Sequence, residues 1–408
     1  MKVVHLSYWD NVGGSGRAAY RIHRGLRLAG ASSRMLVAHK ATDDPDVGII
    51  GGRSAGRIDR LIGRSVDRLG WQYLGYPSSW ALPWMRAVRE ADVVQLFNTH
   101  GGYFSHLALG SLARHRPLVW RLSDMWALTG HCGYSYECER WLTGCGACPH
   151  LDEYPALPRD TTAMLWRTKR ELYARTPLTI VSPSRWLADC ARRSPLLGHY
   201  PVHVIPNGLD TDVFRPQPRA AARARFGIAD DARVILFSAV AVDQVRKGGA
   251  YLREALGRLA DTRLRATLLV VGRGAGAWSA GLPFPVRAVD HLDDDAALAA
   301  SYAAADVFVL PTVAENLPNG ILEAMACGTP AVAFEVGGVP DVVRHLETGY
   351  LAAPRDAAGL AKGVELLLAD DDLRARLGHE SRATVEREHG LLLQARRFLA
   401  VYEGLRAR

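Results

Sequence analysis

The sequence predicts an α/β protein of two doubly wound domains, and three observations support this prediction. Short β-branched runs alternate with longer amphipathic stretches, a pattern typical of parallel strands joined by helices. The chain of 408 residues is too long for one ordinary hydrophobic core. A short strand at 202–205 ends in a Pro-Asn-Gly turn, so we expect the first domain to end near residue 200.

Each expected strand is a short apolar run bounded by turn residues. In the first half of the chain these runs are Val3–Tyr8, Ser33–Ala38, Asp92–Phe97, Pro117–Arg121 and Leu178–Ser182. In the second half they are Val234–Ala239, Thr267–Gly272, Val286–Val289, Asp306–Pro311 and Pro330–Phe334. The expected helices are Gly16–Gly30, Ser184–Arg193, Gly248–Leu259, Asp295–Ala304 and Asn319–Cys327, and the tail from about Asp372 is also helical, with an interruption near Gly390.

The composition, with 48% hydrophobic and 23% charged residues, is that of a soluble globular protein. No apolar run approaches the ~20 residues that span a bilayer, and the apolar stretch in Met1–Tyr8 is too short for a signal peptide. We therefore expect a cytoplasmic protein. The formal charge of +8 suits nucleic acid, anionic lipid or phosphorylated small molecules. No nucleic-acid-binding signature accompanies this charge, so a specific nucleic-acid partner is the least favoured of the three.

The segment from Arg53 to Leu69 combines an apolar pattern with a basic one. Its two residue sets are Ile58, Leu61, Ile62, Val66 and Leu69, roughly on one helical face, and the interleaved Arg53, Arg57, Arg60, Arg64 and Arg68. A basic amphipathic helix can lie on an anionic membrane surface, here the inner membrane face. The aromatic residues that follow favour this interpretation: Trp71, Tyr73, Tyr76, Trp80 and Trp84. Alternatively, the apolar face packs on the core and the arginines face solvent.

The strongest chemical pattern lies between Pro311 and Pro330. A strand delivers Pro311, a loop follows, and a helix is expected from Asn319, so Glu315 and Glu323 fall at the carboxyl end of a strand. Ligands of doubly wound sheets bind at that edge. The backbone N–H groups of residues 316–320 could hold a diphosphate, which would leave the carboxylates to accept hydrogen bonds from sugar or ribose hydroxyls. An acidic helix start stabilised by the helix dipole explains the same residues equally well.

A glycine-rich loop joins the first strand to the first helix. Gly13, Gly14 and Gly16 allow a backbone to approach a ligand closely, and the following helix N-terminus favours anions. The dinucleotide-binding pattern is incomplete, because Ala19 stands at its last glycine position.

Several motifs occur together in a familiar order. They are Val204–Asp210, Val271–Gly274, Glu315 and Glu323 with their spacing, Gly328–Pro330, Gly337–Asp341 and Thr348–Leu351. Through nearly its whole length the chain resembles the retaining GT-B glycosyltransferases of family 4. This resemblance implies two Rossmann-like domains that face each other across a cleft. The acceptor-binding domain would be residues 1–200 and the nucleotide-sugar-binding domain residues 201–385, with a C-terminal helix at 386–408 that crosses back to the first domain.

The resemblance also implies roles for individual residues. Glu315 would hold the donor sugar, Glu323 the ribose, and Lys247 would be the cation on the donor diphosphate. The family pattern has an arginine five residues before this lysine, where Val242 stands here, and Arg246 could substitute for it. The full predicted donor site is Gly13, Gly14, Gly16, Arg246, Lys247, Gly272, Leu292, Glu315, Asn316, Leu317, Asn319, Gly320 and Glu323.

Two stretches of the first domain, residues 98–103 and 120–132, are similar to a subgroup of the family. Relatives often carry a histidine directly before the aspartate, but Ser123 stands at that position here. Asp124 is then the predicted polar group nearest the reacting centre, with His100 and His131 behind it.

Four cysteines lie within seventeen residues: Cys132, Cys138, Cys145 and Cys148. In a reducing compartment they favour a structural zinc site within residues 131–150 over two disulfides or free thiols, and His131 or His150 could replace one thiol. Closed four-thiolate coordination leaves no open position, so we expect no metal catalysis.

The expected reaction is transfer of a hexosyl group, with retention, from a UDP- or GDP-sugar. The acceptor would be a glycan, lipid-linked or small molecule, in the biosynthesis of surface polysaccharides or glycoconjugates. In retaining enzymes of this fold the donor phosphate is taken to receive the acceptor proton, so no strong enzymic base is required. The alternatives are a phosphorylase-like enzyme that releases a sugar phosphate and a non-catalytic basic protein that binds polyanions.

Overall fold

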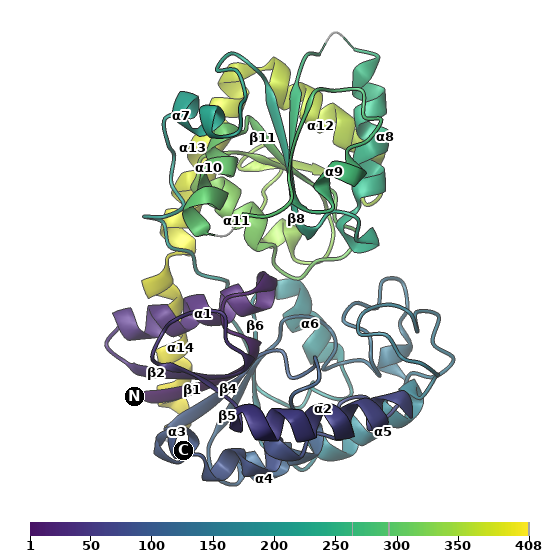
Figure 1. The fold of residues 1–408 in the computed structure, drawn as a ribbon, viewed down its shortest axis with the longest axis vertical. Helices are drawn as coiled ribbons and strands as arrows, with labels where there is room; N and C mark the ends of the chain where they lie inside the picture. Colours follow the sequence, from purple (N-terminus) through teal and green to yellow (C-terminus); the bar gives the residue numbers. More distant parts are fainter. Residues whose placement is uncertain (263, 293, 407–408) are drawn as a thin grey trace. The chain divides into compact units, whose positions relative to one another are not determined.

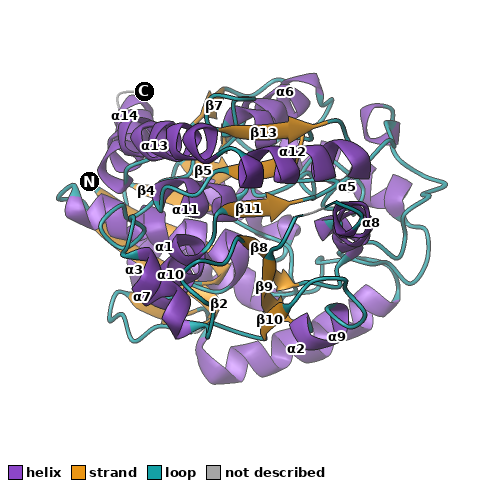
Figure 2. Cartoon of the chain, turned by 90° about the horizontal axis from the view of Figure 1, so that it is seen from above, coloured by secondary structure: helices purple, strands orange, loops and turns teal. Residues whose placement is uncertain are grey.

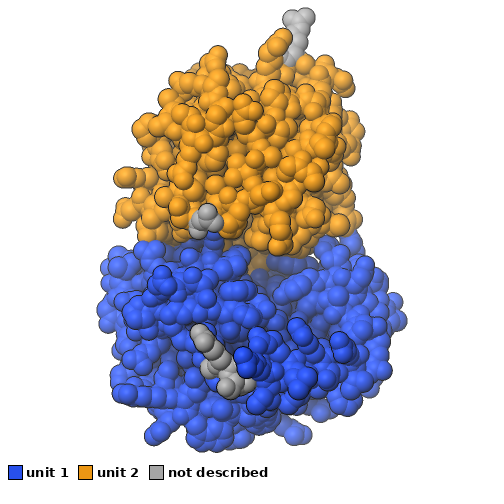
Figure 3. Space-filling view, viewed as in Figure 1, with its two compact units in different colours: residues 1–208, 391–408 blue, residues 209–390 orange. Residues whose placement is uncertain are grey.

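The computed structural model describes residues 1–262, 264–292 and 294–406, without the side chains of residues 52–55. The chain divides into two compact units, which Figure 3 shows in different colours. Unit 1 contains Met1–Gly208 and Leu391–Arg408, and unit 2 contains Leu209–Gly390.

Unit 1 is built around one parallel sheet (Figure 1). Its strands are β1 (Lys2–Trp9), β2 (Ser32–His39), β3 (Val47–Ile49), β4 (Val93–Leu96), β5 (Leu118–Arg121), β6 (Thr179–Ser182) and β7 (Val202–Val204). Its α-helices are α1 (Gly13–Leu28), α2 (Gly52–Arg68), α3 (Arg86–Glu90), α4 (Leu109–Ala113), α5 (Thr162–Tyr173), α6 (Arg185–Arg193) and α14 (Leu391–Arg406). Three short 3₁₀ helices within the described residues connect these elements: η1 (Pro77–Trp84), η2 (His106–Ala108) and η3 (Arg140–Leu142).

Unit 2 repeats this plan with its own parallel sheet. Its strands are β8 (Val234–Ala241), β9 (Thr267–Arg273), β10 (Val286–Val289), β11 (Val307–Leu310), β12 (Ala331–Phe334) and β13 (Gly349–Ala352). Its helices are α7 (Arg219–Arg225), η4 (Val245–Lys247), α8 (Gly249–Ala260), α9 (Ala275–Trp278), α10 (Asp295–Ala304), α11 (Asn319–Ala326), η5 (Val339–Asp341), α12 (Ala357–Ala369) and α13 (Asp371–Glu388).

Both faces of each sheet are covered by helices, as Figure 2 shows from above. In β8, Leu236 joins one apolar cluster, whereas Ile235 and Phe237 join the other. Phe308 and Val309 of β11 divide between the same two clusters. Because every second side chain points to the opposite face, a strand buried on both faces needs a continuous apolar run, which is why the strands could be found in the sequence.

The strand order places a switch point in each sheet. Unit 1 has the order β3-β2-β1-β4-β5-β6-β7 and unit 2 the order β10-β9-β8-β11-β12-β13. The direction of winding reverses between β1 and β4 in unit 1, and between β8 and β11 in unit 2. Loops at the carboxyl ends of two such strands diverge, and ligands of open α/β sheets bind in the space between them.

The last helix, α14, belongs to unit 1 although it follows unit 2 in the sequence. It packs beside α1, as Figure 1 shows, and its Phe398 and Tyr402 are fully buried. Gly25 of α1 lies at the crossing of the two helices: a Cβ there would stand 2.9 Å from the backbone oxygen of Leu391. The absence of a side chain at Gly25 therefore allows the two helix backbones to approach.

The predicted fold class is confirmed, and the predicted elements differ from the observed ones mainly at their ends. Val286–Val289 and Asp295–Ala304 match β10 and α10, whereas the first helix begins at Gly13 rather than Gly16. The elements β3, β13, α5, α7 and α12 were not predicted from the sequence. No helix among residues 1–262, 264–292 and 294–406 combines the length and the apolar character needed to cross a bilayer.

The α1–α14 crossing can be tested with two glycine variants. Gly25→Val should lower the free energy of unfolding by about 1–3 kcal/mol, because the added side chain meets the backbone of α14. Gly404→Ala in α14 is the matched control: its Cβ would meet nothing within 4 Å, so helix propensity should raise stability by up to about 1 kcal/mol. Thermal unfolding followed by circular dichroism measures both, and an unchanged midpoint for Gly25→Val would contradict the close packing.

Candidate functional site

In unit 2, one carboxylate is shared by two cations beside the switch point. The Lys247 ammonium donates to Glu315 Oε2 at 2.7 Å, and Arg246 Nη1 donates to the same oxygen at 3.0 Å. Arg246 and Lys247 lie in η4, after β8, and Glu315 lies in the loop after β11. The ion pairs therefore join the two loops that diverge from the switch point.

Glu315 is held strongly in its charged form. Burial alone would raise the pKa of this carboxyl, but Lys247 and Arg246 outweigh burial and lower the pKa to about 2. For Lys247, burial prevails over the attraction of Glu315, and the pKa of the ammonium is lowered. Only 12% of the Glu315 side chain and 16% of the Lys247 side chain are exposed, so solvent screens this cluster weakly.

The backbone around the cluster leaves little freedom to its loops. Arg246 O accepts hydrogen bonds from Val313 N and Thr312 Oγ1, both at 3.0 Å. Gly248 has φ +70°, and a Cβ there would stand 1.7 Å from Pro311 O. Gly337 has φ +54° and would meet Glu315 O at 1.9 Å. Glycine is thus required where the β8 and β12 loops touch the β11 loop, and the three loops are fixed against one another.

Glu323 lies deeper in unit 2 than Glu315. It is in the middle of α11, and it is buried. The Tyr302 hydroxyl of α10 donates to Glu323 Oε2 at 3.1 Å, which fixes the carboxylate. Asn316 and Leu317 are buried in the loop before this helix, and Asn319 and Gly320 are its first two residues.

Two other residues of the predicted donor site have structural roles in unit 2. Gly272 lies near the end of β9 with φ +141°, and a Cβ there would stand 1.9 Å from Ala239 O at the irregularity in β8. Leu292, in the loop after β10, is partly buried and packs against the apolar cluster that contains Leu236. The structure therefore explains Gly272 by the close approach of two strands.

In unit 1, Asp124 and His100 come together after neighbouring strands. His100 Nε2 lies 3.2 Å from Asp124 Oδ2, and the His100 ring stacks on Trp126 with centroids 5.3 Å apart. Trp126 N donates to Asp124 Oδ1 at 2.9 Å, which fixes the carboxylate in its loop. His131, which the sequence placed behind Asp124, instead contacts Pro155 O and Cys148 Sγ.

The glycine-rich loop of unit 1 meets the same region through hydroxyl groups. Ser15 Oγ lies 2.9 Å from Ser123 Oγ, and the buried Arg121 donates to Ser123 Oγ at 3.0 Å and to Asn207 Oδ1 at 2.6 Å. Ser123 thus connects the start of α1 with the loop after β5.

The three glycines of this loop lie in the first turn of α1, and two of them differ in their surroundings. Gly13 has φ +67° and open space around it, whereas a Cβ on Gly16 would be 3.1 Å from Trp9 Cβ. Gly14 lies between them in the helix. Open space at Gly13 leaves room for a ligand, and Gly16 brings the helix close to the end of β1.

Lys169, a buried residue of α5, was missed in the sequence. Its ammonium donates to Trp126 O at 2.6 Å and Thr129 O at 2.9 Å, and it lies 3.2 Å from the centre of the Trp126 ring. Burial lowers its pKa to about 7. Lys169 therefore fixes the loop that carries Asp124. A lysine on an apolar helical face is its only signal in the sequence.

The predicted zinc site is not supported. Cys132, Cys138, Cys145 and Cys148 line one small pocket together with His131 and His150. No group of three or more histidine, cysteine, aspartate or glutamate side chains in the described part of the chain is arranged to hold a metal ion. All four are free thiols. Burial raises the pKa of Cys132 to about 12 and that of Cys145 to about 11, so both are neutral thiols in this structure.

Comparison with known families identifies both units. The Glycosyltransferase Family 4 model matches residues 12–213, and the Glycosyl transferases group 1 model matches residues 232–370. Together they cover most of unit 1 and unit 2.

Similar proteins and structures agree with these matches. The chain is 32% identical over 313 residues to a D-inositol 3-phosphate glycosyltransferase from Streptomyces bingchenggensis. This match covers 70% of this chain and 67% of the relative. It is 33% identical over 224 residues to a phosphatidyl-myo-inositol mannosyltransferase from Mycobacterium leprae, covering 53% of this chain and 58% of that protein. The structure of HepE from Anabaena in complex with UDP-glucose superposes with a TM-score of 0.66 at 16% identity, covering 99% of this chain and 100% of HepE.

The fold and these matches define the protein as a glycosyltransferase of the GT-B fold. The chain belongs to glycosyltransferase family 4. The expected enzyme class is thereby confirmed, and the alternative of a non-catalytic basic protein is not supported.

The Glu315 ion pairs predict a pH dependence of stability. The pKa of the Glu315 carboxyl is lower in the folded chain than in the unfolded chain, where it is about 4.3. Such a carboxyl stabilises the fold when the pH is above the unfolded pKa, and this stabilisation is lost as the pH falls toward 2. At about pH 6, Glu315→Gln should therefore be less stable than the wild type, by at most about 3 kcal/mol. The difference between their melting temperatures should shrink from about pH 4.5 to about pH 3. A constant difference across this range would contradict the ion pairing.

Proposed function

We propose that the enzyme transfers a hexosyl group, with retention, from a nucleotide diphosphate sugar bound by unit 2. The observation that carries this proposal is the cluster of Arg246, Lys247 and Glu315 beside the switch point of the unit 2 sheet. A ligand with two phosphates and several hydroxyls matches a site that offers two cations and buried carboxylates at one sheet edge.

In this proposal Lys247 and Arg246 interact with the donor diphosphate. The negative charge on a diphosphate grows as the bond to the sugar breaks, so nearby cations stabilise the transition state more than the bound donor. Their shared contact with Glu315 keeps both cations in place before the donor binds. Arg246 thereby supplies the second cation that the family pattern has at the position of Val242.

The two carboxylates have different surroundings and suit different partners. Glu315 lies beside the cations, where an oxygen can accept a hydrogen bond from a hydroxyl of the transferred sugar. Glu323 is buried in α11 and held by Tyr302, so it offers a fixed acceptor to the ribose hydroxyls. The N–H groups at the start of α11, near Asn319 and Gly320, favour a negative ligand at the same place.

Unit 1 would bind the acceptor. Asp124, fixed by Trp126 N and paired with His100, is the charged group that we expect near the acceptor hydroxyl. The donor phosphate would receive the proton of that hydroxyl, so Asp124 needs only to orient the acceptor. The names of the two relatives specify one inositol phosphate and one phosphatidylinositol acceptor, so we propose only a hydroxyl-bearing glycan, lipid-linked or small-molecule acceptor, in glycoconjugate or polysaccharide biosynthesis.

A thermal-shift screen tests the donor site. The wild type, Glu323→Gln and the control Glu335→Gln would be heated with UDP, GDP, ADP or CDP, and with their common sugar derivatives. Glu335 is an exposed carboxylate of the same unit. One nucleotide at about 100 times its Kd should stabilise the wild type and the control by about 2.7 kcal/mol, and Glu323→Gln much less. If no nucleotide stabilises the wild type, the donor proposal fails.

Turnover with the donor found in that screen tests the role of Lys247. Lys247→Met should lower kcat about 10²–10³-fold, because a group that stabilises the leaving diphosphate is lost. Lys362→Met, at an exposed position of α12, is the matched control and should retain wild-type turnover. An equal kcat in Lys247→Met and Lys362→Met would refute the assignment.

Proton NMR of the first product formed shows whether the anomeric configuration is retained. Added phosphate reveals any sugar phosphate from a phosphorylase-like reaction.

A further inference from the structure

Helix α2 packs on unit 1 through its polar and glycine face. Asp59 accepts hydrogen bonds from Ser78 N at 3.0 Å and from the Ser78 hydroxyl. Gly63 lies directly over a tyrosine, since a Cβ there would stand 2.5 Å from the Tyr76 ring. The core-packing alternative for the apolar face is therefore wrong: of the predicted apolar set only Val66 is half-buried, and the other four residues are exposed.

The second aspartate of α2 also faces inward. Asp67 accepts hydrogen bonds from Tyr73 N and from the Tyr76 hydroxyl, both at 2.8 Å. Tyr73 and Tyr76, which the sequence placed with the aromatics of a membrane-facing segment, are buried beneath the helix. Both acidic side chains of α2 are thus used to attach the helix to the rest of unit 1.

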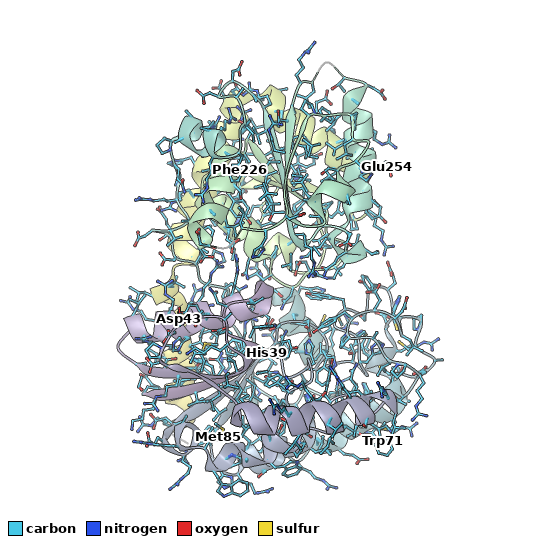
Figure 4. The ribbon with its side chains drawn as sticks, viewed as in Figure 1. His39, Asp43, Trp71, Met85, Phe226 and Glu254 are labelled. Carbon is cyan, nitrogen blue, oxygen red and sulfur yellow. The ribbon has the colours of Figure 1, made fainter. Side chains whose placement is uncertain are left out.

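The apolar side chains of α2 are left in solvent. We call Ile58, Leu61, Ile62 and Leu69 the apolar row; their exposed fractions are 55%, 73%, 40% and 48%. Spacings of three, four and seven residues place them on one side of a helix, about a sixth of a turn or more from Asp59 and Gly63. Trp71, 48% exposed, follows at the end of the helix, where Figure 4 labels it. Figures 1 and 2 both show α2 at the outside of unit 1.

A basic row lies beside the apolar row. Arg57, Arg60, Arg64 and Arg68 recur every three or four residues and are all exposed. The side chain of Arg53, also in the predicted basic set, lies outside the described residues. Because Asp59 and Asp67 face inward, the solvent side of α2 from Arg57 onward combines apolar and positive groups without an acidic one.

We propose that this side of α2 is a docking surface for an anionic lipid bilayer. A helix with an apolar stripe and flanking arginines can lie in the membrane interface, with its apolar side chains among the acyl chains and its cations near lipid phosphates. Trp71 suits the same depth, because its ring is amphipathic. A second copy of this chain is a poorer partner, since a two-fold contact would bring two basic rows together. This inference goes beyond the proposed function and does not depend on the donor site.

Vesicle flotation of the full chain tests the proposal. The probes are vesicles of phosphatidylcholine alone and vesicles with about one third phosphatidylglycerol, at low and high salt. The wild type should float with the anionic vesicles and much less with the neutral ones. Ile58→Ser/Leu61→Ser/Ile62→Ser should bind the anionic vesicles at least about tenfold more weakly, because it loses the side chains that enter the bilayer. Failure of the wild type to float, or undiminished binding by the triple variant, would overturn the proposal.

Further variants and measurements distinguish lipid docking by α2 from general charge attraction, from misfolding and from self-association. Leu28→Ser, at an exposed leucine of α1 in the same unit, should float like the wild type. Arg64→Gln/Arg68→Gln should lose binding and its salt dependence, whereas Arg192→Gln/Arg193→Gln on α6 should retain both. The thermal unfolding of the triple variant, followed by circular dichroism, should have a midpoint close to that of the wild type, which shows that unit 1 remains folded. A wild-type dimer that the triple variant abolishes, without vesicle binding, would overturn the proposal and assign the surface to a second copy.

Discussion

A single carboxylate shared by two cations determines the arrangement of the loops at the carboxyl edge of the unit 2 sheet. The order of the strands runs in opposite directions from β8 and from β11, so the loops that follow these two strands diverge. The hydrogen bonds of the sheet do not hold the two loops together. Glu315 does so by binding Arg246 and Lys247 from the other side of the switch point. Glycines at 248 and 337 then allow the neighbouring backbones to close around the pair. These ion pairs and backbone contacts fix the loops against one another, and a site on fixed loops loses less conformational entropy when a ligand binds.

The sequence predicted the fold well because the physical signals for it are local. A strand buried on both faces must be an apolar run, and a helix that follows it begins and ends with recognisable residues, as α10 and α11 do. The strands β3 (Val-Gly-Ile) and β13 (Gly-Tyr-Leu-Ala) each contain a glycine and are only partly buried, so they show no continuous apolar run. Glu315 could be selected from its place after a strand, and Lys247 and Arg246 from the resemblance to family 4. The structure brings the three into contact.

Other features depend on contacts that sequence spacing does not encode. The apolar row of α2 is equally compatible with a buried face, but the helix is attached through Asp59, Gly63 and Asp67, whose partners lie in a following segment. Lys169 was missed because its partners are backbone oxygens of a loop far away in the sequence. The four clustered cysteines do share a pocket, but their side chains are not arranged to hold a metal ion. In each case a tertiary environment, and not a residue type, decides the role.

The position of α14 has a consequence for how the chain acquires its structure during synthesis. The sequence of unit 1 is interrupted by the whole of unit 2, and Phe398 and Tyr402 complete an apolar cluster whose other members include Val3, Ile22 and Met35. Until α14 has left the ribosome, that face of the first sheet lacks part of its cover, and its apolar residues are exposed to water or to other chains. Unit 2, which is continuous in sequence, can close its core earlier. The core of unit 1 can therefore be completed only after the whole of unit 2 has been synthesised.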